Sequence, residues 1–336
     1  MSNKKKSRSW RKRLRPLRHS LVFGLVLAGR ELLRIYPTDV AVRLGAVLGR
    51  LSYWLRPKER RLALEHLQLA FGNEKTAAER RRIVREMFAN VGRSVAEMVT
   101  LERWSRDDLL QRIRCAEPDK FDRLRQGRGV IIVSAHLGNW ELMSVFTALG
   151  LQQPVDIVIR DMTNPHLGRM FRRSRETMGL NVLERGKTGR EFFRTLRRDR
   201  LMGILLDQDT KHGPGLFVDF FGRPAFTQLG PYQLAARSKA TVATTFIVRE
   251  PDGIHHRLLI GDELPPLEGE SEEARARHFV QAATARIEEI IRQYPEQWLW
   301  FHQRWKRRPL TVAPDEQPVA PKAKKPRLKG DPFVSA

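Results

Sequence analysis

GRGVIIVSAHLGNWEL, from Gly127 to Leu142, combines a buried-strand pattern with two ionisable residues close behind it. The uncharged, mostly β-branched run from Val130 to Val133 predicts a strand covered on both faces, as in a parallel α/β sheet. The apolar-periodic segment from Trp140 to Leu149 predicts a helix directly afterwards. His136 and Glu141 therefore lie at the carboxyl end of a buried strand, where open α/β sheets usually bind ligands.

The spacing of His136 and Glu141 restricts how the two side chains can meet. Residues five positions apart on one helix point about 140° apart, at ~100° per residue, so His136 must precede the helix if the two are to touch. A glutamate in the first turn then reaches one imidazole nitrogen and leaves the other facing the cleft. That arrangement is a general base with an orienting carboxylate. The alternative is that His136 only caps the helix and Glu141 only solvates its first turn.

Alternating strand and helix patterns extend this unit along the chain. They predict a mostly parallel central sheet flanked by helices, because strands separated by helical segments form βαβ units. Arg160 and Asp207 then join His136 at strand carboxyl ends. The expected strands are 155–159, 181–183, 201–206 and 241–248, and the expected helices are 165–178, 188–199 and 229–239.

The N-terminal part has a different composition. Residues 1–20 form a basic arm, and residues 21–29 form an apolar run of only nine residues, whereas a spanning helix needs about 20. Apolar residues at helical spacing follow from Asp39 to Leu55, and a capping box at Thr76 opens a helix that runs to about Met98. These features favour a helical anchor in the cytoplasmic leaflet. The alternative for residues 39–55 is a buried helix of the domain.

The charge of the chain is strongly positive, with 62 Lys and Arg against 38 Asp and Glu, or +24. The first 20 residues carry nine of these charges and the last 22 a net two, so about +13 remains on the residues between. Nucleic acid, an anionic membrane and an acidic protein are the ordinary partners of such a chain. No zinc-finger spacing or RNA-recognition pattern is present, so nucleic acid is not an expected partner. Cys115 is the single cysteine, which excludes a disulfide framework.

Four sequence blocks together resemble one enzyme family. AHLGNWE resembles the His-x-x-x-x-Asp/Glu block of glycerolipid-type acyltransferases, and its GNWE form is similar to the branch that adds late acyl chains to lipid A. Residues 159–179, 205–227 and 295–309 resemble further blocks of the same branch, in the same order. Two positions depart from the family pattern: His66 stands where Asn is more usual, and Gly72 where Pro is common.

The resemblance implies a specific reaction. A fatty acyl group moves from acyl carrier protein to the hydroxyl of a 3-hydroxyacyl chain on a lipid A precursor, with His136 as general base and Glu141 as its orienting residue. The phosphopantetheine thioester is then a co-substrate, and no cofactor is expected. The implied fold is glycerolipid-acyltransferase-like, and the implied location is the cytoplasmic face of the inner membrane, with its lipids as partners.

Further site residues are predicted around this pair. Arg160 and Arg175 suit phosphate groups, because a planar guanidinium binds phosphate through two hydrogen bonds, and the resemblance selects these two arginines. The resemblance implies that Asp207 shapes the cleft by hydrogen bonding or by pairing with a cation, and Asp209 is placed with it. Two carboxylates alone make a weak metal site, so no metal is expected. The Asn139 side chain, or the amides after Gly138, are candidate donors to the tetrahedral oxyanion.

Two aromatic clusters have alternative interpretations. Phe217, Phe220 and Phe221 are either core residues or the lining of an acyl-chain tunnel. The tryptophans between Pro295 and Pro309 suit either a membrane interface or core packing. The predicted organisation is a basic arm (1–20), a helical membrane-associated region (21–112), an α/β acyltransferase domain (113–312) and a disordered basic tail (313–336).

Three other functions are compatible with parts of the pattern. In the first, the protein transfers an acyl group to another glycolipid or to an amino-acid lipid. The second is a basic membrane- or nucleic-acid-binding protein in which His136 and Glu141 are only structural. The third is metal-dependent hydrolysis, which predicts loss of activity on chelation.

Overall fold

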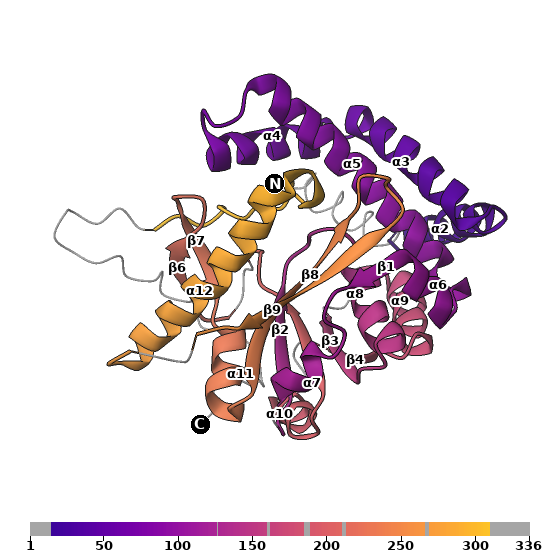
Figure 1. Ribbon diagram of the computed structural model, residues 1–336. Coiled ribbons are helices and arrows are strands. Elements are labelled where there is room, and N and C mark those ends of the chain that lie inside the picture. Colours follow the sequence, from indigo (N-terminus) through magenta and orange to yellow (C-terminus); the bar gives the residue numbers. More distant parts are fainter. Residues whose placement is uncertain are drawn as a thin grey trace, which may run out of the picture.

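The computed structural model describes residues 15–125, 127–159, 162–184, 189–209, 213–265 and 269–309. A seven-stranded sheet forms the centre, with helices against both faces (Figure 1). The strand order is β1-β9-β8-β2-β5-β3-β4, and β6 and β7 form a separate antiparallel hairpin. The strands are β1 (Ile113–Cys115), β2 (Val130–Ser134), β3 (Val155–Ile159), β4 (Asn181–Glu184), β5 (Leu201–Leu205), β6 (Gly215–Asp219), β7 (Pro224–Gln228), β8 (Thr241–Arg249) and β9 (His256–Glu263).

The sheet confirms the α/β prediction. β2 is buried at every residue and pairs in parallel with both β8 and β5, which explains its continuous apolar sequence. Among the pairs of this sheet only β8 and β9 are antiparallel. The strand prediction missed β1, β9 and the β6–β7 hairpin. β1 has only three residues, and β9 alternates between buried and more exposed positions, so neither gives a continuous apolar run.

The helices follow their sequence signals closely. The capping box at Thr76 is present, with the Thr76 side chain accepting from the Glu79 amide and the Glu79 carboxylate accepting from the Thr76 amide. The segment after His136 is an α-helix continued by one π-helical turn that ends at Gly150. The longer helices are α2 (Arg15–Arg34), α3 (Thr38–Leu55), α4 (Pro57–Phe71), α5 (Ala77–Thr100), α9 (Pro165–Thr177), α10 (Gly189–Arg197), α11 (Gly230–Ser238) and α12 (Glu272–Gln293); the shorter are η1 (Leu101–Arg103), α6 (Arg106–Arg112), α7 (Lys120–Arg125), α8 (Trp140–Val145), η2 (Phe146–Gly150) and η3 (Pro295–Gln297).

Helix α3 packs against α5 through its small residues. A Cβ on Gly49 would lie 2.2 Å from the Phe88 carbonyl oxygen, and one on Gly92 would lie 2.0 Å from that of Gly45. Backbones this close need residues without side chains at the contact. The large apolar residues of α3 therefore point outward, and the predicted apolar face is the exposed one. Its exposed members are Val40, Leu44, Val47, Leu48, Leu51, Trp54 and Leu55.

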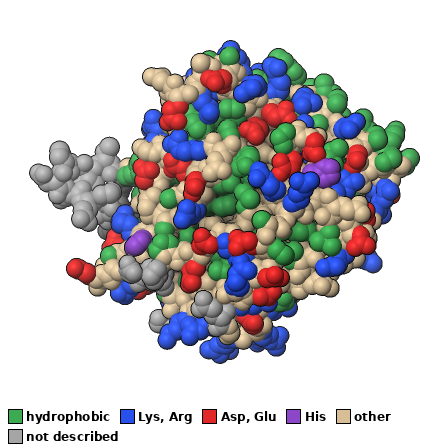
Figure 2. Space-filling view, in the orientation of Figure 1, with side chains coloured by type: hydrophobic (Ala, Val, Ile, Leu, Met, Phe, Trp, Pro, Cys, Tyr) green, Lys and Arg blue, Asp and Glu red, His purple; other side chains and the backbone are tan. Residues whose placement is uncertain are grey.

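Helix α2 continues this apolar surface, and five of its large hydrophobic side chains are exposed: Leu17, Leu21, Val22, Leu25 and Leu32. Figure 2 shows hydrophobic side chains along the upper right margin, over the region of α2 and α3, with Lys and Arg between them. Within the described ranges, no helix is both long and apolar enough to cross a membrane. Most of the basic arm (residues 1–14) and the whole predicted tail (313–336) lie outside the described residues.

The C-terminal aromatic residues belong mostly to the core. Trp298 and Trp300 are fully buried, with ring centroids 4.6 Å apart. Phe220 packs against Trp298 at 5.9 Å and is also fully buried. Core packing is thus the correct interpretation for these three side chains, because their neighbours are other aromatic rings and not a lipid surface.

Candidate active site

The loop that carries His136 is held on both sides. Leu137 forms an isolated antiparallel bridge with Trp298, and the Gly138 amide donates to the Gln297 carbonyl oxygen at 2.9 Å. Gly138 has a φ of +62°, and a Cβ there would lie 2.0 Å from the Ile247 carbonyl oxygen. A glycine is therefore required for the chain to turn between β8 and the C-terminal segment. His136 precedes the helix, as its spacing to Glu141 predicted.

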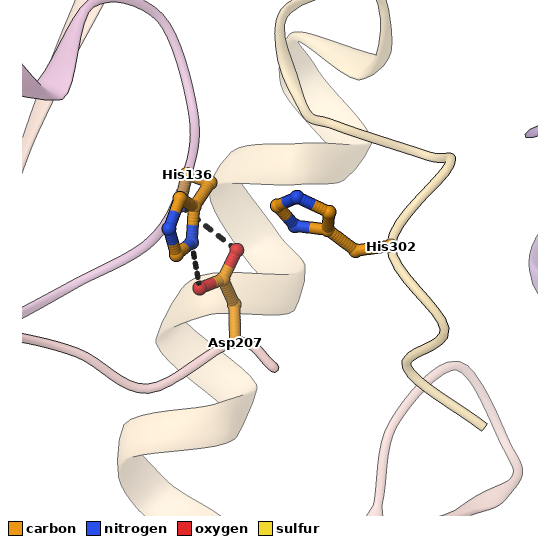
Figure 3. A group of neighbouring side chains, drawn as sticks. All are labelled: His136, Asp207 and His302. Atoms are coloured by element: carbon orange, nitrogen blue, oxygen red, sulfur yellow. Dashed lines mark hydrogen bonds and ion pairs between the residues drawn. The ribbon is translucent and has the colours of Figure 1, made fainter. Parts of the chain in front are cut away.

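The imidazole of His136 is oriented by Asp207. Its Nδ1 lies 2.8 Å from Asp207 Oδ1, and its backbone amide donates to Asp207 Oδ2 at 2.8 Å (Figure 3). The indole of Trp298 also donates to Oδ2, at 2.7 Å. Burial alone raises the pKa of Asp207, but the charge of His136 and its hydrogen bonds lower that pKa below the ordinary aspartate value. Asp207 is therefore a carboxylate that holds Nδ1 as the donor and leaves Nε2 as the basic nitrogen.

The register of two strands brings His136 and Asp207 together. Ser134 at the end of β2 pairs with Leu205 at the end of β5, and each site residue follows two positions later. Parallel neighbours therefore present both side chains at one edge of the sheet. The sequence placed Asp207 at this edge, but it gave no indication that β5 is the direct neighbour of β2.

Glu141 does not contact His136 in this structure. Its two carboxylate oxygens accept from Arg175 Nε at 2.9 Å and Nη2 at 2.6 Å. The predicted hydrogen bond from Glu141 to the imidazole is therefore wrong. Its side chain lies against α9, where a bidentate guanidinium is a stronger partner than a neutral imidazole, and Asp207 already occupies Nδ1. Both members of the Glu141–Arg175 pair are largely buried beside the loop.

Asn139 has a structural role. Its Oδ1 caps α8 by accepting from the Leu142 amide at 3.1 Å, and its Nδ2 donates to Glu97 at 2.8 Å. Glu97 is buried and paired with Arg249, which keeps the Glu97 pKa low although burial alone raises it. The Asn139 side chain is thus hydrogen-bonded within the protein, contrary to the prediction that it points a donor at the cleft. It ties the His136 loop to α5.

The remaining predicted site residues are Asp209 and Arg160. Asp209 is buried and accepts from the Arg307 amide at 2.8 Å and from Arg307 Nε at 3.0 Å, so it anchors the C-terminal segment. Arg160 lies outside the described residues. A cavity of about 720 Å³ lies between β4 and α10 and contains none of the predicted site residues.

Two residues near His136 were not predicted from the sequence. Gln208 Nε2 lies 3.1 Å from His136 Nε2 and 2.8 Å from His302 Nδ1. The rings of His136 and His302 are 5.0 Å apart and nearly perpendicular. Burial lowers the pKa of His302 to about 4, so this ring is neutral at physiological pH. His302 follows a tryptophan-rich segment without a recognisable spacing to His136, and only the fold brings the two together.

Within the described residues, His136, Asp207 and His302 offer ligand atoms within 4.8 Å of one another. Each is a chemically suitable metal ligand. However, Asp207 already accepts three hydrogen bonds, from the His136 ring, the His136 amide and Trp298. A metal there would have to displace the contact that orients His136, so the donor set fits a catalytic base better than a metal.

Comparison with known proteins shows the family of the chain. The family model described as bacterial lipid A biosynthesis acyltransferase matches residues 8–307. The chain therefore belongs to the bacterial lipid A biosynthesis acyltransferase family, and it is an acyltransferase of lipid A biosynthesis. The matched region includes the His136 loop, strand β5 and the C-terminal aromatic segment. It also includes Asp207, which follows β5.

Individual relatives are similar over most of their length. A lipid A biosynthesis palmitoleoyltransferase of Escherichia coli (strain K12) is 29% identical over 283 residues, which cover 82% of this chain and 87% of the relative. A lipid A biosynthesis lauroyltransferase of the same organism is 27% identical over 287 residues, with coverage of 82% and 88%. A phosphatidylinositol mannoside acyltransferase of Mycolicibacterium smegmatis is 27% identical over 189 residues, with coverage of 55% and 59%.

Proposed function

We propose that this protein transfers a fatty acyl group from acyl carrier protein to a hydroxyl of a lipid A precursor, with His136 as general base. The observation that carries the proposal is the contact of His136 Nδ1 with the buried Asp207 carboxylate. This contact fixes the tautomer in which Nε2 is unprotonated and accepts a proton.

The proposed reaction has two steps. His136 Nε2 takes the proton of the acceptor hydroxyl while its oxygen attacks the thioester carbonyl and forms a tetrahedral oxyanion. The oxyanion then collapses, the carbon–sulfur bond breaks, and the departing phosphopantetheine thiolate takes the proton from the imidazolium. The products are an acyloxyacyl ester and free thiol. Asp207 stabilises the imidazolium between the two steps because its own pKa stays low.

The Glu141–Arg175 pair lies beside this base and has a binding role in the proposal. Arg175 uses Nε and Nη2 for Glu141, so Nη1 is the donor left for a ligand oxygen. Glu141 fixes the plane of the guanidinium, and the guanidinium orients a phosphate or carbonyl group of a substrate. Arg160 remains a proposed second phosphate contact on the strength of the sequence resemblance.

The charge of the chain favours both proposed substrates. Acyl carrier protein and lipid A phosphates are acidic, and a basic protein attracts both at long range. The phosphopantetheine thioester is the co-substrate, and the chemistry needs no further cofactor.

The apolar surface of α2 and α3 supports attachment to the cytoplasmic face of the inner membrane. Among the described residues, 17 large hydrophobic side chains are exposed and 14 of them lie between Leu17 and Leu55. A cluster of this kind marks an interaction surface. Each leucine that leaves water for lipid stabilises the bound state by about 1.5–3 kcal/mol. Exposed Arg18 and Arg43 add attraction to anionic headgroups.

The test is an in vitro assay of the full chain in membranes, with acyl carrier protein thioesters of several chain lengths and a defined lipid A precursor. Wild type should produce a precursor that carries one more acyl chain, detected by mass spectrometry. His136→Ala should abolish transfer and leave thermal unfolding and vesicle binding unchanged. Transfer by His136→Ala at the wild-type rate would exclude His136 as the base.

Another glycolipid acceptor is the second candidate, favoured by the similarity to a phosphatidylinositol mannoside acyltransferase. Offering a phosphorylated mannolipid and the lipid A precursor in competition separates the two acceptors. A chelator in the same assay tests metal-dependent hydrolysis. That alternative predicts free fatty acid as the product and loss of activity when the chelator is added. Binding to DNA or RNA without any acyl transfer would support the remaining alternative.

A further inference from the structure

The loop after β2 has few donors left for an oxyanion. The amide of His136 donates to Asp207, that of Leu137 to the Ala135 carbonyl oxygen at 2.8 Å, and that of Gly138 to the Gln297 carbonyl oxygen at 2.9 Å. The Asn139 side chain donates to Glu97. Because each backbone N–H group donates one strong hydrogen bond, the amides of His136, Leu137 and Gly138 are not free to bind a developing negative charge. The Asn139 side chain keeps a second N–H but is almost fully buried. The amides that begin α8 have no intrahelical partner and are the other candidate donors.

The side-chain amide of Gln208 lies next to the base and carries two N–H groups, of which one is directed at His302. Its Nε2 lies 3.1 Å from His136 Nε2 and 3.2 Å from His136 Nδ1. Nearly equal distances to both nitrogens of one ring place the amide against the face of the imidazole. The lone pair of Nε2 lies in the ring plane, so it stays open to an incoming hydroxyl while the amide stands beside it.

His302 holds the Gln208 amide in this position. Its Nδ1 lies 2.8 Å from Gln208 Nε2, and its low pKa keeps the ring neutral and able to accept. An acceptor at this place selects the N–H side of the carboxamide and turns it toward His136. Gln208 is only half-buried, so its amide is close to the base and still within reach of a ligand.

We propose that Gln208 is a further catalytic residue, whose carboxamide N–H donates to the oxyanion of the tetrahedral intermediate, and that His302 is its positioning residue. The assignment rests on the acyl transfer proposed above. When the hydroxyl oxygen attacks, the carbonyl electron pair moves to oxygen and the oxyanion accepts from Gln208. When the carbon–sulfur bond breaks, the carbonyl re-forms and this hydrogen bond weakens, so it stabilises mainly the intermediate.

Steady-state kinetics of the full chain in membranes test the role of Gln208. Gln208→Leu removes the donor at similar size, and kcat should fall about 10²-fold while KM for both substrates stays within about threefold. The control is Gln303→Leu, an exposed glutamine in the same segment as His302, which should keep wild-type kinetics. A Gln208→Leu variant with unchanged kcat, or with only a raised KM, would overturn the assignment.

The pH profile gives a readout that a purely structural role would not change. Gln208→Glu places a carboxylate beside His136, which favours the imidazolium. The acidic limb of kcat/KM should therefore move to higher pH, by about one unit for a tenfold electrostatic effect. An unshifted limb would mean that residue 208 does not face the base.

Variants of His302 test the positioning role. His302→Phe removes the acceptor and should lower kcat about tenfold, whereas His302→Asn keeps an acceptor near the Nδ1 position and should restore most of it. Equal kinetics for these two variants would overturn the role of His302. An active wild type with an unimpaired Gln208→Leu variant would refute only this inference, whereas an inactive wild type would refute it together with the proposed function.

Discussion

Helix α3 and strand β2 are both apolar in sequence, but they use their apolar residues in opposite ways. β2 is buried at every position between β8 and β5. α3 buries Ala41, Gly45 and Gly49 against α5 and exposes larger side chains such as Leu48 and Trp54. An apolar pattern therefore shows which face avoids water, and it does not show whether protein or lipid covers that face.

The difference divides the molecule into a part that contains the candidate active site and a part whose exposed apolar surface is proposed to bind the membrane. The His136 loop, Asp207 and the C-terminal aromatic segment meet at one edge of the sheet, whereas most of the exposed large apolar residues in the described part of the chain lie on α2 and α3. If the two parts are independent, a substitution in one should leave the property of the other unchanged. The following predictions test this independence, from the largest expected effect to the smallest.

Asp207→Asn should lower kcat on the order of 10³-fold, because a neutral amide no longer stabilises the His136 imidazolium. Binding to anionic vesicles should not change, since α2 and α3 are untouched. Single-turnover transfer and vesicle co-sedimentation measure the two properties. Asp262→Asn, at an exposed carboxylate paired with Lys120, is the matched control. A variant within tenfold of wild type would refute the role of Asp207.

The double variant Leu48→Glu, Leu51→Glu should reduce partition into phosphatidylglycerol vesicles by about 10²-fold or more, because two leucines no longer leave water. The free energy of unfolding should change by less than about 0.5 kcal/mol, since both side chains are exposed. Leu110→Glu, an exposed leucine on α6, is the control. Loss of partition by this control as well would show that α3 is not the attachment surface.

His256→Leu should make stability less sensitive to acid. His256 is fully buried near Glu97, and burial lowers its pKa to about 3. Between pH 6.5 and 3 the unfolded chain therefore binds a proton that the folded chain does not, so stability falls as the pH falls through this range. From pH 6.5 to 5 this loss is about 2 kcal/mol.

The loss should disappear in His256→Leu, as measured by urea unfolding at both pH values. His302, whose pKa is also lowered, keeps its own contribution in the variant. Identical slopes for wild type and His256→Leu would contradict the buried, uncharged state of His256.

Glu141→Gln and Arg175→Lys should each lower kcat/KM about tenfold, because either change breaks the bidentate contact. The double variant should be no worse than either single one, since the two side chains act as a unit. A double-mutant cycle in the transfer assay measures this coupling. Additive losses would mean that Glu141 and Arg175 act independently, and a loss as large as that of Asp207→Asn would return Glu141 to the role of orienting residue.

Local patterns allowed much of the site to be predicted from the sequence. The run from Val130 to Val133 and the helix after it placed His136 at a strand end, and the same argument placed Asp207. The pairing of His136 was predicted incorrectly because Glu141 is its neighbour in sequence, whereas its partner follows β5. Gln208 and His302 had no distinguishing spacing, so only the approach of β5 to the C-terminal segment reveals them.

The sequence by itself determined the elements and the kind of chemistry, because helix periodicity, capping and strand burial depend on residues near one another in the chain. The tertiary structure decided which partners meet. The strand order brings Asp207 into contact with the His136 imidazole, and Arg175 of helix α9 binds the Glu141 carboxylate. Close α3–α5 packing left the large apolar residues outside. Such contacts join segments far apart in sequence, so their geometry depends on how the sheet and helices pack and not on local spacing.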